Sequence, residues 1–220
     1  MREQLLLMGG RAEAMTKKAL RALERREPHL ADEVFDDDNA IDRLEIDIEE
    51  RCVRLLALQQ PMARDLRFIT AALKISNDLE RVGDHAVNIA GAAKKLSALP
   101  LLKPLVDIPR MESLASAMLR DALDAFVRRD TESARRLVNR DDEVDQLNRQ
   151  LFRELLTFMI EDPTTISRSL ELILVARNLE RIADLATNIA EEVVFIAEAR
   201  IIKHHAEEQT SAHDDDFGRS

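Results

Sequence analysis

Apolar and polar positions recur with a helical period along most of the chain. When residues 62–97 are placed at about 100° per residue, one broad arc is apolar and the opposite side is polar. The apolar arc holds Ile69, Ala72, Leu73, Ile75, Leu79, Val82, Ala86, Val87 and Ala90. The polar side, which we expect to face solvent, holds Lys74, Asn77, Asp78, Arg81 and His85. The segment is therefore predicted to be one long amphipathic helix.

Proline marks the boundaries between the helical segments. Pro28, Pro61 and Pro163 suit the first turns of new helices, because proline is tolerated there and not in a helix interior. Three more prolines lie in the stretch "LPLLKPLVDIPR" and cannot all belong to one helix. The predicted helices are 3–26, 29–59, 62–97, 110–129, 131–160 and 164–206.

The second half of the chain repeats the first. "NDLERVGDHAVNIA" at 77–90 returns as "RNLERIADLATNIA" at 177–190, and "MTKKALRAL" at 15–23 returns as "MLRDALDAF" at 118–126. A repeat of this length indicates a duplicated structural unit. We predict an all-α fold of two tandem, similar three-helix bundles. The predicted divisions are a first bundle at 1–98, a proline-containing linker at 99–109, a second bundle at 110–206 and a disordered acidic tail at 207–220.

Composition narrows the class of protein. Glycine and proline are few, Trp and Tyr are absent, and the net charge of −10 argues against binding of nucleic acid or anionic lipid through general electrostatics. The chain contains no apolar run of about 18 residues, so no transmembrane segment is predicted. The single cysteine, Cys52, falls at a helical core position and fits a buried thiol in a reducing compartment. We expect a cytoplasmic protein.

Paired carboxylates stand out within the repeat. Each half contains two acidic pairs spaced four residues apart, where like charges are neighbours on a helix and repel each other. The pairs are Asp38/Asp42 and Glu80/Asp84 in the first half, and Asp141/Asp145 and Glu180/Asp184 in the second. Neighbouring antiparallel helices would bring the two pairs of one half together. Four carboxylates at one place would have raised pKa values or would bind a cation such as magnesium, calcium, manganese or iron.

Two interpretations of these acids remain open at this point. One is a metal site in each bundle. The other is a solvated rim in which the acids pair across helices with Arg67, Arg81, Arg177 or Arg181. The histidines His204, His205 and His213 lie in or beside the tail and are expected to be solvated. No nucleophile motif or glycine-rich phosphate loop is present, so no catalytic residue is predicted.

Several of these stretches resemble the PhoU family of phosphate-signalling proteins. The resemblance is carried by "LLLMGG", "ALQQPMARDLRFITAALKISNDLERVGDHAVNIA" (57–90), "MIEDP" and "ARNLERIADLATNIAEEVVF" (176–195), and it covers roughly residues 5–200. It implies two tandem three-helix bundles. It also implies multinuclear iron or zinc clusters, one per bundle, on the paired acidic motifs, which match at all eight positions named above.

The resemblance further implies a regulatory role. Such proteins restrain phosphate uptake and phosphate-starvation signalling by linking the ATPase subunit of a phosphate ABC transporter to a sensor histidine kinase. Many form homodimers, and this one would lie in the cytoplasm, peripherally at the membrane through its partners. The family's first helix is usually longer than the one here, so either this helix is short or the true start lies upstream; a short helix would reduce any partner surface that it supplies. The alternatives are a carboxylate-bound metalloprotein with hydrolytic or metal-storage activity, and a purely structural or chaperone-like bundle.

Overall fold

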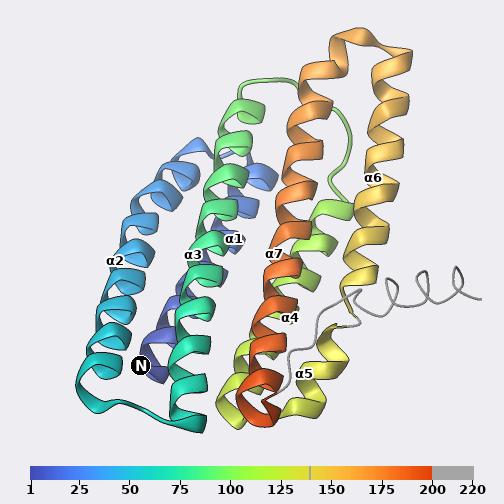
Figure 1. Cartoon of the computed structure of the whole chain (residues 1–220). Coiled ribbons are helices and arrows are strands. Elements are labelled where there is room, and N and C mark those ends of the chain that lie inside the picture. The colour runs from blue at the N-terminus through green and yellow to red at the C-terminus, as the bar shows by residue number, and fades with distance from the viewer. Residues whose placement is uncertain (139, 200–220) are drawn as a thin grey trace, which may run out of the picture.

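The structure is a computed structural model that describes residues 1–138 and 140–199, and these residues form an all-α fold (Figure 1). The predicted fold class is confirmed: two three-helix bundles stand side by side. The first bundle contains α1 (Arg2–Arg25), α2 (Pro28–Gln59) and α3 (Ala63–Ser97). The second contains α4 (Asp107–Arg128), α5 (Thr131–Val138), α6 (Asp141–Glu161), the 3-10 helix η1 (Pro163–Thr165) and α7 (Ile166–Glu198).

The predicted helix at 131–160 is wrong, because two helices, α5 and α6, cover this stretch. The Asp130 carboxylate caps the start of α5 by accepting a hydrogen bond from the Ser133 N–H at 3.0 Å. The backbone N–H of Arg140 turns back to the carbonyl of Leu137 at 2.8 Å. Acidic residues then open α6, where the positive end of the helix dipole favours them. A hydrophobic period continues through this turn, so periodicity alone does not reveal it.

Prolines and residues in the left-handed backbone conformation mark the ends of several helices. Pro28 occupies the first turn of α2, and Arg26 ends α1 in the left-handed conformation with φ 59°. Pro109 lies within the first turn of α4, so that helix begins at Asp107, three residues before the predicted start. Helix α7 ends at Glu198. The rest of the predicted final helix and the predicted disordered tail lie outside the described residues.

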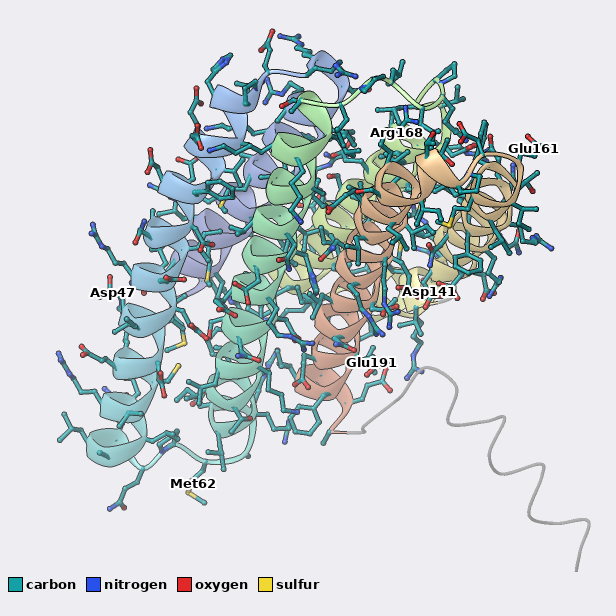
Figure 2. The ribbon with its side chains drawn as sticks, turned by 90° about the horizontal axis from the view of Figure 1, so that it is seen from above. Asp47, Met62, Asp141, Glu161, Arg168 and Glu191 are labelled. Atoms are coloured by element: carbon teal, nitrogen blue, oxygen red, sulfur yellow. The ribbon has the colours of Figure 1, made fainter. Side chains whose placement is uncertain are left out.

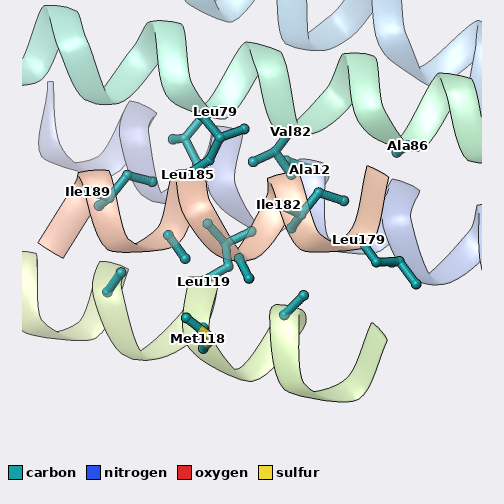
Figure 3. Close-up of a cluster of buried hydrophobic side chains, with 14 of the residues drawn as sticks. Ala12, Leu79, Val82, Ala86, Met118, Leu119, Leu179, Ile182, Leu185 and Ile189 are labelled. Atoms are coloured by element: carbon teal, nitrogen blue, oxygen red, sulfur yellow. The ribbon is translucent and has the colours of Figure 1, made fainter. Parts of the chain in front are cut away.

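The two bundles meet along α3 and α7, which run antiparallel (Figure 1). Figure 3 shows the apolar core around this contact, where Leu79 and Val82 of α3 lie near Ile182 and Leu185 of α7. All four side chains are buried. This contact joins the bundles through hydrophobic burial, the main favourable contribution to folding.

The polar side of α3 was expected to face solvent, and this is wrong for part of it. Asp78 is 9% exposed, and Lys74 makes a salt bridge at 2.7 Å with Glu192 of α7. His85 Nδ1 lies 2.8 Å from the Asn178 Oδ1 atom of α7. The polar side of α3 is therefore largely the flank of the contact between bundles. A helical wheel places these residues opposite the bundle core correctly but contains no information about a second bundle.

Other expectations are met by the described residues. Cys52 is fully buried, as predicted for a structural thiol. No helix in the described ranges is both long enough and apolar enough to cross a membrane. Figure 2 shows Met62 at the turn between α2 and α3, and Glu161 at the turn between α6 and α7. These turns join α2 to α3 and α6 to α7, which gives one helical hairpin in each bundle.

Candidate functional site

The first cluster, defined as Asp38, Asp42, Glu80 and Asp84, lies between α2 and α3. Asp38 and Asp42 lie one turn apart on α2, and Glu80 and Asp84 lie one turn apart on α3. The negative charges of Asp42 and Asp84 both act on Asp38, and those of Asp38 and Asp42 act on Glu80. The structure therefore brings together the four acids that the sequence singled out in the first half.

Gly83 allows α2 and α3 to approach closely beside this cluster. A Cβ atom at Gly83 would lie 3.2 Å from Ile41 Cδ1 and 3.4 Å from Asp38 Oδ1. Ile41 is fully buried and sits between Asp38 and Asp42 on α2. Close packing against the glycine holds this part of α2 against α3. The carboxylates along both helices are therefore fixed near one another by apolar contacts rather than by their own charges.

The electrostatics of the first cluster are unfavourable when all its members are ionised. Burial raises the pKa of Glu80, and the negative charges of Asp84, Glu45, Asp42 and Asp38 raise it further, to about 7. Burial also raises the pKa of Asp38, with added contributions from Asp42 and Asp84. The raised pKa of Glu80 therefore reflects burial first, and then the negative charges of the neighbouring acids.

Glu45 is a fifth acid of this region that the sequence analysis did not identify. Burial raises its pKa, a hydrogen bond from the Asn77 side chain opposes this, and Glu49, Asp42 and Asp84 raise it again. The signal was available, since Glu45 follows Asp42 by three residues and Asn77 precedes Glu80 by three. Both therefore lie on the helix faces that carry the predicted acids.

No cation neutralises the first cluster within the part of the chain that the structure describes. None of its four carboxylates forms a salt bridge with Lys or Arg there. Of the two arginines considered in the first half, Arg81 pairs with Asp78 at 3.8 Å. Arg67 donates to the backbone carbonyl of Ile196 at 3.4 Å. The interpretation as an arginine-paired rim therefore fails for the first cluster.

The second cluster, defined as Asp145, Glu180 and Asp184, differs because arginines accompany it. Arg181 lies 3.1 Å from Asp184 and 3.9 Å from Glu180, and Arg149 lies 3.5 Å from Asp145. Burial and the negative charges of Asp184 and Asp145 raise the pKa of Glu180. The positive charges of Arg181 and Arg177 act in the opposite direction and lower this pKa. Arginines therefore do accompany this cluster, but each of these pairs lies within one helix, whereas the arginine-paired interpretation expected pairs across helices.

Asp141, the eighth predicted site residue, has a distinct setting. It is the first residue of α6 and is only 7% exposed. The helix dipole favours a negative charge at that position. Asp141 therefore has a structural reason to be acidic that Asp38, its counterpart within α2, does not have.

The donor chemistry of the first cluster fits a cation, but its side chains do not converge on a single point. Across the described residues, no three His, Cys, Asp or Glu side chains form a group with the geometry to hold a metal ion. The cluster nevertheless offers only carboxylate oxygens, carries uncompensated charge, and has at least one raised pKa. Oxygen ligands of this kind are those that hard cations prefer.

The raised pKa of Glu80 predicts a pH-dependent stability. The pKa is about 7 in the folded protein against 4.5 for an unperturbed glutamate, so the folded state binds this proton more tightly. The contribution to stability is complete below pH 4.5 and is lost as the pH rises through 7. After discounting for solvent screening of a partly exposed side chain, Glu80→Gln should raise the free energy of unfolding by about 1 kcal/mol at pH 8.

Urea unfolding of chelator-treated protein at pH 5 and pH 8 measures this effect. The gain for Glu80→Gln should appear at pH 8 and vanish at pH 5. The exposed Glu50→Gln variant on α2 is the matched control and should behave like the unaltered protein at both pH values. Equal stability of Glu80→Gln and the unaltered protein at pH 8 would contradict the raised pKa.

The fold and the site together define a class of protein: a duplicated three-helix bundle with a carboxylate cluster between the second and third helices of each repeat. Comparison with protein families identifies the class. The PhoU domain matches the chain twice, at residues 5–93 and 108–193, which are the two bundles. The chain belongs to the PhoU family.

Curated relatives agree over most of the chain. A phosphate-specific transport system accessory protein PhoU homolog of Aquifex aeolicus is 44% identical over 203 residues, covering 92% of this chain and 92% of the relative. A protein of the same name from Caulobacter vibrioides is 46% identical over 189 residues, covering 86% of this chain and 82% of the relative. The similarity thus spans both bundles.

Solved structures show the same fold. The crystal structure of PhoU from Pseudomonas aeruginosa superposes with a TM-score of 0.87 at 40% identity, covering 90% of this chain and 96% of that one. The structure of the phosphate transport system regulatory protein PhoU from Streptococcus pneumoniae superposes with a TM-score of 0.85 at 30% identity, covering 91% and 95%. The tandem arrangement of the two bundles is therefore shared with both.

Proposed function

We propose that this protein is a negative regulator of phosphate uptake and of phosphate-starvation signalling. The observation that carries the proposal is the match of both bundles to the PhoU family, together with relatives named as accessory proteins of phosphate-specific transport. A role in phosphate transport regulation follows from that membership. The finer proposal is that the protein acts by contact, as a cytoplasmic adaptor between the ATPase subunit of a phosphate ABC transporter and a sensor histidine kinase.

The helical scaffold supports an adaptor. Two bundles that pack together along α3 and α7 present separate hairpins, so two partners have room to bind one chain. Regulation of this kind requires no chemical step on the protein itself. A homodimer, as the family resemblance implies, would double these faces.

Deletion of the gene tests this role. In medium with ample phosphate, the deletion strain should take up phosphate faster and express phosphate-starvation genes, and a plasmid copy should restore repression. The measurements are uptake of radiolabelled phosphate and a starvation-promoter reporter. Unchanged uptake and reporter activity in the deletion strain would overturn the proposal.

We also propose that the first cluster binds a multivalent cation, with iron or zinc as the expected ions. The support is the difference between the two clusters: arginines pair with acids of the second, whereas no Lys or Arg among the described residues forms a salt bridge with the first. The cation would be held by Asp38, Asp42, Glu80 and Asp84, and Glu45 would lie beside them. A bound cation would supply positive charge between α2 and α3 and lower the pKa values of the acids around it.

In this proposal the residues of the chain have structural tasks. Ile41 and Gly83 keep α2 against α3, and the Asn77 side chain hydrogen bonds to Glu45. The four carboxylates of the two helices would hold the cation, which would supply positive charge to the cluster. The equivalent acids of the second bundle were also predicted to bind metal, and the arginines beside them make that site the weaker one.

A further inference from the structure

An apolar surface with an arginine rim covers the α6–α7 hairpin. Large hydrophobic side chains are exposed on both helices, and the most exposed is Ile160 at 75%. On each helix they recur every four residues, which places them on one face. They are Phe152, Leu156 and Ile160 on α6, and Ile166, Leu170 and Leu174 on α7. Contiguous exposed apolar surface of this kind marks an interaction site more often than a chance arrangement.

The surface is hollowed between the two helices. A groove of about 350 Å³ lies there. Its lining is Asn148, Arg149, Phe152 and Arg153 from α6, and Ile173 and Arg177 from α7. Figure 1 shows α6 at the outer edge of the second bundle, with α7 beside it and in contact with α3 of the first bundle. The groove lies between α6 and α7, because its lining contains residues of these two helices alone.

The rim of the groove carries positive charge that the chain itself leaves available. Arg153 and Arg177 are exposed, and neither forms a salt bridge with the residues that the structure describes. Arg149 lies 3.5 Å from Asp145 and is also mostly exposed. Three arginines along an apolar groove are unusual in a chain of net charge −10.

The first bundle offers an internal comparison, because it carries the same hairpin. A residue of α6 corresponds to the residue of α2 that precedes it by the same distance in sequence as Asp38 precedes Asp141. A residue of α7 corresponds to the residue of α3 that precedes it by the same distance as Glu80 precedes Glu180. The equivalents of Phe152, Arg153, Arg177, Leu170 and Leu174 are Glu49, Glu50, Asn77, Thr70 and Lys74. The first hairpin also exposes apolar side chains, with Val53 and Leu66 at the positions equivalent to Leu156 and Ile166. The arginines of the groove, rather than exposed apolar residues as such, therefore distinguish the second hairpin.

We propose that the groove between α6 and α7 is a docking site for an acidic amphipathic helix of a partner protein. Such a helix would place apolar side chains at i, i+4 and i+7 in the groove, against Phe152 and Ile173. Its flanking Asp or Glu side chains would pair with Arg153 and Arg177. Carboxylate–guanidinium pairs at the edge of an apolar contact fix register and exclude partners of the wrong charge.

The shape and charge of this region favour a helix over a membrane surface. A groove between two helices accommodates a rod, whereas a bilayer presents a broad surface. Glu180 and Asp184 lie on α7 within two turns of Arg177, and they would repel anionic lipid headgroups approaching the same face. A single narrow acidic helix can contact the arginines and avoid these acids.

Designed peptides test the proposal. The probe is a helical, alanine-rich peptide of about five turns with Leu at i, i+4, i+7 and i+11 and Glu on both flanks. The comparison peptide has Lys in place of every Glu. Fluorescence anisotropy of labelled peptides with the full chain should show at least tenfold tighter binding of the acidic peptide. Equal affinity for the two peptides, or no binding of the acidic one, would overturn the proposal.

Variants locate the binding to the groove. Arg153→Glu with Arg177→Glu should weaken the acidic peptide at least tenfold and reverse the preference between the peptides. Phe152→Ser, which removes the exposed apolar side chain of the groove lining, should weaken both. Arg43→Glu with Arg54→Glu, on exposed positions of α2, makes the same change in net charge and should have no effect. Circular dichroism and Tm confirm that each variant is folded, since all of these positions are exposed.

Two other occupants are outcomes that would contradict the proposal. If the groove receives a second copy of the chain, Arg153→Glu with Arg177→Glu will shift the oligomeric state in sedimentation equilibrium. If it receives membrane, the same variant will abolish binding to phosphatidylglycerol vesicles while the acidic peptide fails to bind. The groove would accept any partner with such a helix. The result of the peptide-binding test is therefore independent of the result of the phosphate-uptake test.

Discussion

Replacing Ile41 with Ala should lower the free energy of unfolding by about 3 kcal/mol, because a fully buried branched side chain is lost from a close-packed contact. The Ile41 side chain fills the space between α2 and the Cβ-free position of Gly83 on α3. The cavity would form directly behind Asp38 and Asp42. Ile41→Ala should therefore also weaken any property that depends on the spacing of the first cluster.

Chemical unfolding by urea measures the loss of stability. The matched control is Ile46→Ala, which removes the same atoms from an exposed position on the same helix, 53% exposed, and should change stability by less than about 0.5 kcal/mol. Similar losses for the two variants would show that the contact between Ile41 and Gly83 does not fix α2 against α3.

Adding iron or zinc to chelator-treated protein should raise Tm by about 5 to 10 °C when the free ion exceeds its Kd about a hundredfold, corresponding to roughly 2.7 kcal/mol. The stabilisation arises because the folded chain presents several carboxylates whose mutual repulsion the ion relieves. The variant with Asp38→Asn, Asp42→Asn, Glu80→Gln and Asp84→Asn should lose the ion-dependent increase. It should also be at least as stable as the unaltered protein without metal, because the repulsion is gone.

The second cluster provides the control for this experiment. The control variant replaces every acid of that cluster, with Asp145→Asn, Glu180→Gln and Asp184→Asn. The ion-dependent increase in Tm should persist in this variant. Mass spectrometry of the folded protein measures how many ions are bound. An increase in Tm that survives the first set of substitutions would place the cation elsewhere and contradict the proposed site.

The fold was predictable because duplication and helical period both act locally along the chain. Proline positions and the repeated "LER" and "NIA" stretches were enough to place most helix boundaries within a few residues. The break between α5 and α6 was not, because it depends on one capping aspartate and one backbone turn at Arg140. A hydrophobic pattern that continues across such a turn looks like one helix.

The candidate site was predictable in its members and not in its electrostatics. The acidic pairs of the first half lie together as their spacing indicated, and Glu45 joins them. Arg81 lies three residues from both Asp78 and Asp84 on α3, and helical spacing alone does not decide which of the two it pairs with. Arg181 pairs within its own cluster, while its counterpart Arg81 turns toward Asp78 at the contact between bundles.

The central claim is that the first bundle contains a carboxylate cluster whose charge the chain does not compensate. The most direct measurement is a titration of the Glu80 side-chain carboxyl carbon by NMR, in chelator-treated protein from pH 4 to pH 9. The account predicts a midpoint near pH 7, shifting downward when Asp84 is replaced with Asn. A midpoint near 4.5, the value of an unperturbed glutamate, would contradict it.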